Sequence, residues 1–247
     1  TAGEVQQLTV WNGQLIAGGN FTGGGMDRVA AWNGSSWQPL GPGAPNALQA
    51  LAVWNNLLVA VGYTTTTVVP QIRTWNGSTW TTLPNPPNLT IPRTAASYRG
   101  VLCVGGHGSI SAQGVLERWD GSAWSSSILA SGPSSGVITC LSVRSSIAIG
   151  GTDTLYVGGH FTSIGGTQAT AVASTNSIVS PSWSPVAANT SPDCEALHAR
   201  SVGTSGLSVT AVFWGNGTRQ YTNSTGTWSS LALSMHFTSL SYYAGTY

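Results

Sequence analysis

Charge is nearly absent from this sequence. Only 6 % of its 247 residues are charged, against about 25 % in ordinary soluble domains. All eight basic residues are arginine, no lysine occurs, and seven carboxylates leave a formal net charge of +1. So few cations cannot form a basic stripe, which argues against nucleic-acid partners and anionic membranes. A surface with so little charge needs another source of solvation, or is suited to association.

Long apolar runs are also missing. No stretch approaches the roughly 20 apolar residues that cross a bilayer as a helix, so the sequence predicts no membrane insertion. A catalytic constellation is missing too, because there is no nucleophile elbow and no convergent carboxylate pair. Glu117 and Asp120 lie three residues apart on a predicted strand and therefore on opposite faces, and Asp120 is better explained by an Asp-Gly turn. We expect no cofactor and a non-enzymatic protein.

The sequence is built on a repeat. Residues 8–40 hold two alternating apolar runs, a Gly-rich connection and a hairpin around Asn33-Gly34, which read as four short antiparallel strands. The hairpin motif Trp32–Trp37 returns 43 residues later at Trp75–Trp80, and 44 residues after that at Trp119–Trp124. A four-stranded unit repeated about every 40 to 50 residues is typical of a β-propeller.

The hairpin also predicts a particular geometry. Asn-Gly favours a two-residue type I′ turn, because both residues tolerate positive φ. In that register Trp32 faces Ser35 and Ala30 faces Trp37, so the two tryptophans form a diagonal pair on one face. We expect Trp32, Trp75 and Trp119 to pack between blades.

The second strand of the unit ends in a Gly-Gly pair that repeats in register, at Gly19, Gly106 and Gly159, with a single glycine at Gly62. This pattern and the downstream tryptophan resemble kelch-type propellers. The fuller forms IAGGNFTGGG at residues 16–25 and YVGGHFTSIGG at 156–166 are similar to the repeats of fungal Rax2-like secreted and cell-surface proteins. The resemblance spans nearly the whole chain, and implies a propeller fold rather than a function.

The sequence therefore predicts an all-β chain that forms a single β-propeller domain over residues 1–247. Its four-stranded antiparallel blades fall at about 5–40, 47–83, 93–128, 137–186 and 193–233. Residues 235–247 read as an extra strand, either the first of a sixth blade in a longer polypeptide or a strand that docks on a neighbouring copy. The threonine run 64–67 is expected to extend a strand, with O-glycosylation as the alternative.

Asn-X-Ser/Thr triplets supply a source of solvation other than charge. Two of them occupy the same hairpin tip in successive repeats, where a glycan would not disturb a core, and two more lie in predicted loops. The seven candidate N-glycosylation sites are Asn20, Asn33, Asn76, Asn88, Asn189, Asn216 and Asn223. The alternative is that a chain rich in Asn, Ser and Thr produces some of these triplets by chance.

Histidines and cysteines give the remaining candidates. His107 and His160 share one repeat position and could face a common rim, but no third ligand stands at a suitable spacing, so no metal site is predicted. The three cysteines, Cys103, Cys140 and Cys194, leave one unpaired in an oxidising compartment. Cys140 and Cys194 fall near the starts of the innermost strands of neighbouring blades, and we expect them to form the disulfide.

Three function classes follow. The preferred one is a non-enzymatic, N-glycosylated structural protein, secreted or at the cell surface, that forms a filamentous or other assembly. Its partners would be copies of itself or other extracellular glycoproteins, with glycans as further ligands. The second class is a carbohydrate-binding propeller. The third is a secreted kelch-type oxidase or hydrolase, although no copper-site motif of that family can be matched to residues here.

Overall fold

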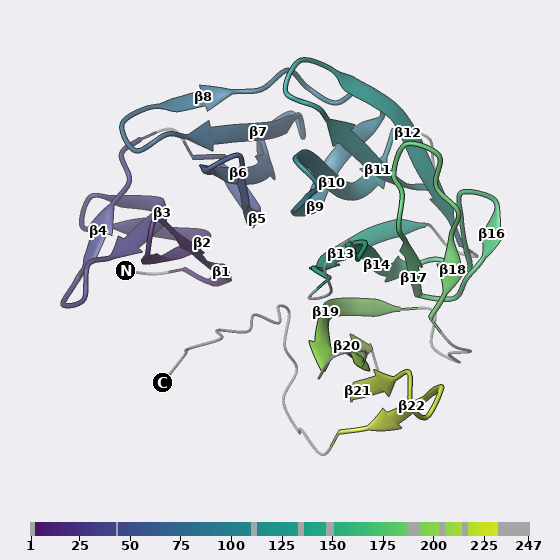
Figure 1. Cartoon of the computed structure of the whole chain (residues 1–247). Coiled ribbons are helices and arrows are strands. Elements are labelled where there is room, and N and C mark those ends of the chain that lie inside the picture. The colour runs from purple at the N-terminus through teal and green to yellow at the C-terminus, as the bar shows by residue number, and fades with distance from the viewer. Residues whose placement is uncertain are drawn as a thin grey trace. The chain divides into compact units, whose positions relative to one another are not determined.

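The computed structural model describes residues 3–42, 44–109, 113–132, 136–146, 151–186, 193–202, 206–213 and 217–231 (Figure 1). In these residues the regular structure is antiparallel β-sheet, without helix, in sheets whose strands follow one another along the chain. The fold is therefore all-β and of the β-propeller class, as the repeat predicted. None of the described segments forms a helix of the length and hydropathy needed to span a membrane.

The chain divides into two compact units, and the boundary runs through β12. The first unit holds the first two blades and most of the third. Blade 1 contains β1 (Val5–Trp11), β2 (Gln14–Gly23), β3 (Met26–Trp32) and β4 (Trp37–Pro39). Blade 2 contains β5 (Ala47–Trp54), β6 (Leu57–Tyr63), β7 (Pro70–Trp75) and β8 (Trp80–Thr82). Blade 3 contains β9 (Leu89–Tyr98), β10 (Val101–Gly108), β11 (Gln113–Trp119) and β12 (Trp124–Ser131).

The second unit holds blades 4 and 5. Blade 4 contains β13 (Val137–Arg144), β14 (Thr154–His160), β17 (Val172–Thr175) and β18 (Ser184–Pro185). Blade 5 contains β19 (Cys194–Val202), β20 (Gly206–Phe213), β21 (Gly217–Thr222) and β22 (Thr227–Ser230). A short hairpin, β15 (Ser163–Ile164) and β16 (Thr167–Gln168), leaves blade 4 and pairs with the second half of β12, where Ala130 faces Ile164. The predicted extra strand at 235–247 lies outside the described residues.

The repeated glycine at the end of the second strand in blades 1 to 4 has a structural cause. The first strand of every blade carries a β-bulge opposite this position, which brings one of its carbonyl oxygens towards the second strand. A Cβ at Gly62 would lie 2.2 Å from the Ala47 oxygen, and one at Gly106 would lie 2.1 Å from the Ile91 oxygen. In blades 1 to 4 only glycine fits against the bulge, which explains why this residue recurs there although the rest of the strand varies, whereas blade 5 has Phe213 at this position.

Blades 2, 3 and 5 each bury one face on the blade before them in the sequence, and we call this face of a blade its leading face. Between blades 1 and 2, Ile16 and Val29 pack on Leu51, Leu58 and other leading-face residues of blade 2. The same positions recur between blades 2 and 3, where Leu102 and Trp119 cover Val59. Blades 4 and 5 meet in an equivalent apolar cluster in the second unit. Trp75 and Trp119 are 8 % and 5 % exposed, in agreement with the predicted packing, whereas Trp32 is only half-buried.

Indole groups link consecutive blades at a sequence separation of 40 to 42 residues. The tryptophan that opens the fourth strand donates its Nε1 hydrogen to the backbone carbonyl that ends the preceding blade. These bonds run from Trp80 to Leu40 (3.0 Å), from Trp124 to Pro84 (2.7 Å) and from Trp228 to Val186 (3.0 Å). Trp37, at the same position in blade 1, is 37 % exposed and makes no such bond within the described residues. A further pair of bonds runs the other way, from Trp11 to Asn56 and from Trp54 to Gly100.

The predicted type I′ hairpin turn is wrong. Trp32 pairs directly with Trp37, and Ala30 pairs with Pro39, so the loop contains four residues rather than two. The cause is the Asn33 side chain, whose Oδ1 accepts the backbone N–H groups of Ser35 and Ser36 and holds an Asx turn. The two rings therefore face each other, with centroids 5.5 Å apart.

The threonine run also differs from the expectation of an extended strand. β6 ends at Tyr63, and Thr64 closes a turn by accepting the Val68 N–H on its carbonyl and the Val69 N–H on its hydroxyl. Local hydroxyl-to-backbone bonds of this kind compete with strand pairing, and here they prevail over the strand propensity of threonine. Residues 65–69 of this turn are exposed.

Candidate functional site

The hairpin tips present two candidate glycosylation sites in the same geometry. Asn33 and Asn76 are exposed, and Oδ1 of each accepts two backbone N–H bonds at 2.9 to 3.0 Å across its own turn. Neither Nδ2 atom donates a hydrogen bond within the described residues. Because N-glycosylation uses the amide nitrogen and leaves the oxygen as an acceptor, both turns could carry a sugar without losing the bonds that hold them.

Blade 3 carries an aspartate in place of the tip asparagine. Asp120 Oδ1 accepts the same bonds from the N–H groups of Ser122 and Ala123, at 2.8 and 2.9 Å. The backbone N–H of Ala123, followed by that of Ser122, lowers the pKa of the Asp120 carboxyl. Asp120 therefore belongs to a hairpin turn, as the sequence predicted. Glu117, by contrast, is buried inside blade 3, where its Oε1 accepts the Asn88 N–H at 3.1 Å.

The other candidate asparagines have different surroundings. Asn20 is exposed in β2, and its backbone N–H donates to the Glu4 carbonyl at 2.8 Å. Asn88 is half-buried, and Asn223 is exposed with its Oδ1 accepting the Leu207 N–H at 3.0 Å. Asn189 and Asn216 lie outside the described residues. Exposure therefore favours Asn20, Asn33, Asn76 and Asn223 over Asn88.

The second unit contains a small polar pocket that the sequence did not indicate. It lies where β17 leads through a loop into β18, and has a volume of about 260 Å³, just under the range of about 300 to 1,000 Å³ for ligand pockets. Its seven lining residues are Ser174, Thr175, Asn176, Ser177, Ser180, Ser182 and Ser184. A serine-rich loop was the available signal, but serine is common throughout this chain.

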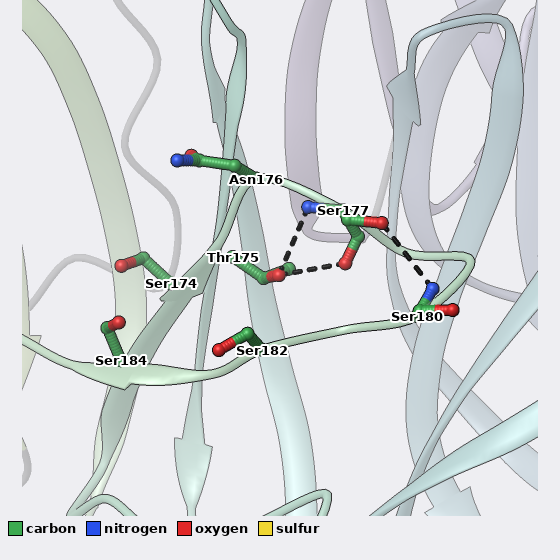
Figure 2. Close-up of a pocket in the computed structure, with 7 residues that line it drawn as sticks. All are labelled: Ser174, Thr175, Asn176, Ser177, Ser180, Ser182 and Ser184. Carbon is green, nitrogen blue, oxygen red and sulfur yellow. Dashed lines mark hydrogen bonds between the residues drawn. The ribbon is translucent and has the colours of Figure 1, made fainter.

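Hydrogen bonds within the loop shape this pocket (Figure 2). The Thr175 hydroxyl donates to the Ser177 carbonyl at 2.8 Å and accepts the Ser177 N–H at 3.2 Å, so these two residues hold the loop. Ser174 and Ser184 face each other across the β17–β18 pair, with Ser182 beside them (Figure 2). The lining has hydroxyl and amide groups but no titratable or aromatic side chain, so it suits hydrogen bonding to an uncharged polar ligand and not acid–base chemistry.

The two candidate histidines lie in different units of the chain. His107 lies in β10 of the first unit, and His160 ends β14 in the second. The His160 ring lies between two carboxylates of blade 5, with Nε2 2.8 Å from Glu195 Oε1 and Nδ1 3.8 Å from Asp193 Oδ1. In the part of the chain that the structure describes, no three His, Cys, Asp or Glu side chains form a metal-binding group. His160 thus ties the first strand of blade 5 to blade 4.

The cysteines separate into one isolated residue and one pair. Cys103 is fully buried in β10, and burial raises the pKa of its thiol to about 12. Cys140 and Cys194 meet in the interface of blades 4 and 5, with their Sγ atoms 3.7 Å apart.

Comparison with known proteins gives no match to a protein-family model and none to a curated protein. The propeller class therefore rests on the sheets themselves. Since unrelated activities share this class, a function has to be argued from the exposed turns, faces and pocket.

Proposed function

We propose that this protein is a non-enzymatic, N-glycosylated structural glycoprotein of the cell exterior, which assembles with copies of itself. The observation that carries the proposal is the recurrence of one turn geometry at Asn33 and Asn76, each with an exposed amide whose nitrogen is left over by the turn. Glycans at these tips would solvate a surface that has few charges. The kelch-type and Rax2-like resemblance of the repeats supports the same extracellular location.

Blade 3 offers a sharp test of the glycan hypothesis. Asp120→Asn places an Asn-Gly-Ser triplet in a turn of the same geometry, and Asp120→Asn with Ser122→Ala removes the acceptor triplet but keeps the backbone donors. In a secretory eukaryotic host, intact-mass measurement before and after glycan release should show glycans at Asn33 and Asn76. It should show one more in Asp120→Asn and no gain in the double variant. A folded, secreted chain with bare Asn33 and Asn76 would overturn the proposal.

The leading face of blade 1 supports assembly. Leu15 is 37 % exposed, whereas Leu58 and Leu102, at the same repeat position, are fully buried by the blade before them. Leu8 is 39 % exposed, and its counterpart Leu51 is 1 % exposed. Among the described residues of the first unit, no sheet covers this face. Its apolar pattern is the one that packs against a neighbouring blade in blades 2 and 3. A contiguous apolar face of this kind marks a contact surface, and we propose a second copy as its partner.

Self-association of the purified, glycosylated chain tests this partner. Sedimentation over a concentration series should show assembly, and Leu15→Asp should shift it towards the monomer. Val179→Asp is the matched control, because Val179 is 85 % exposed on a loop of the second unit. A monomer at every concentration, or equal behaviour of the two variants, would contradict the proposed partner.

The serine-lined pocket favours a second candidate function, carbohydrate binding. Several hydroxyl groups and one amide line this pocket of about 260 Å³, and none of them is charged. Such a lining matches the hydrogen-bonding groups of a neutral sugar. A glycan array with the whole chain should identify a ligand whose binding is weakened by Ser182→Val and unaffected by Ser229→Val, a control on the exposed face of β22. An array without signal, or a signal that Ser182→Val leaves unchanged, would remove this candidate.

A further inference from the structure

Blades 4 and 5 bring two cysteines into contact. Cys140 lies in β13 and Cys194 opens β19, the first strands of their blades. The two residues are 8 % and 0 % exposed, and their Sγ atoms are 3.7 Å apart. They come from different sheets and are 54 residues apart in the sequence, and both are free thiols in the structure. Van der Waals contact between two buried sulfurs leaves a short approach to a covalent bond.

The neighbouring residues make room for this pair. A Cβ at Gly158 would lie 2.5 Å from Cys140 Sγ and 2.9 Å from Cys194 Sγ. The equivalent position in blade 2 is Val61, so the strand itself does not require glycine there. The Thr139 hydroxyl, next to Cys140, donates to the Cys194 carbonyl and so fixes the two strands against each other. The space beside Gly158 is therefore filled by the two sulfurs.

We propose that Cys140 and Cys194 form a disulfide that links blade 4 to blade 5 in the mature protein. Formation needs an oxidant of the disulfide class, such as oxidised glutathione or an oxidised dithiol protein. One cysteine thiolate attacks the donor disulfide and releases a donor thiolate, which leaves a mixed disulfide. The second cysteine thiolate then attacks the mixed disulfide and releases the other donor thiol. The pair loses two protons and two electrons, and the donor is reduced to two thiols.

Burial sets when this reaction can take place. Both sulfurs lie inside the interface, and burial raises the pKa of the Cys194 thiol, so the attacking thiolate is disfavoured once the blades have packed. Oxidation therefore accompanies folding and does not follow it. Cys103 is buried in the other unit, which leaves it as the one free thiol.

Within the described residues blade 5 packs on one other blade, and the bond would secure it there. Blade 5 packs on blade 4 through the apolar cluster that includes both cysteines. At positions where blade 2 presents Ala52 and Trp54 to blade 3, blade 5 has His198 and Arg200. This face of blade 5 is more polar than the equivalent face of blade 2 and is therefore less suited to pack against a further blade. A covalent link to blade 4 would compensate for the weaker apolar contact at this face.

Thiol mapping after refolding in a glutathione redox buffer tests the pairing without any assumption about secretion or glycosylation. The chain is denatured, alkylated without reduction and mapped by mass spectrometry. We expect alkylation at Cys103 alone, and at all three cysteines after reduction. Cys194→Ala should make Cys140 alkylatable, and Cys103→Ala should leave no free thiol. Three alkylated cysteines in the oxidised wild type, or a bond that includes Cys103, would overturn the proposal, and neither result depends on how well a variant folds.

Discussion

Trp80→Phe, compared with Trp37→Phe, tests whether the indole bonds between blades stabilise the fold. Both substitutions remove the same atoms from the same repeat position. Only Trp80 donates a hydrogen bond, to the Leu40 carbonyl at 3.0 Å, whereas Trp37 makes none within the described residues. The difference between the two variants therefore reports the bond between blades together with the packing of Trp80 on the cluster of blades 1 and 2.

The expected difference is about 1 kcal/mol, because one neutral hydrogen bond contributes about 0.5 to 1.5 kcal/mol. In a chain of this size that corresponds to a melting temperature about 2 to 4 °C lower for Trp80→Phe than for Trp37→Phe. Urea and thermal unfolding followed by far-UV circular dichroism give both values without a tryptophan signal. Equal stability of the two variants, or a greater loss in Trp37→Phe, would refute the assignment of these bonds as links between blades.

Three further predictions concern the disulfide, the bulge glycine and a half-buried histidine. Cys140 and Cys194 are 54 residues apart, and reduction of the disulfide between them should lower the free energy of unfolding by about 4 kcal/mol. Equal urea midpoints with and without reductant would contradict this. Gly62→Ala should cost about 1 to 3 kcal/mol in thermal unfolding, because its Cβ would lie 2.2 Å from a backbone oxygen, and an unchanged melting temperature would show that the bulge relaxes. Burial, followed by the charge of Arg200, lowers the pKa of His198 below 6.5, so the unfolded chain takes up this proton first as the pH falls. His198 should therefore destabilise the fold increasingly below pH 6.5 and not above it, and urea unfolding of His198→Gln across this range should show a smaller acid loss than the wild type.

The sequence by itself determined the fold class and the position of the blades. Alternation along short strands, the hairpin motif at spacings of 43 and 44 residues and the glycine at the end of the second strand in four repeats are local patterns, and strand formation follows local patterns. The same patterns located the exposed tips at Asn33 and Asn76, because a loop between two strands lies at the surface.

Local sequence was not sufficient where a side chain competed with the backbone. The Asn-Gly pair predicted a two-residue turn, but Asn33 Oδ1 accepts two backbone hydrogens and lengthens the loop to four residues. Thr64 likewise closes a turn in a run whose propensity predicted a strand. Both outcomes depend on a few hydrogen bonds that composition does not encode.

Contacts between blades were decided only by the tertiary structure. They join residues some 40 to 54 positions apart, such as Trp80 with Leu40 and Cys140 with Cys194. The sequence proposed the cysteine pair from strand position, but only the packed blades place the sulfurs in contact beside Gly158. The exposure of Leu15 could not be predicted from the sequence either. The same repeat position is buried or exposed according to what packs on it, and the strand pattern is the same in both cases.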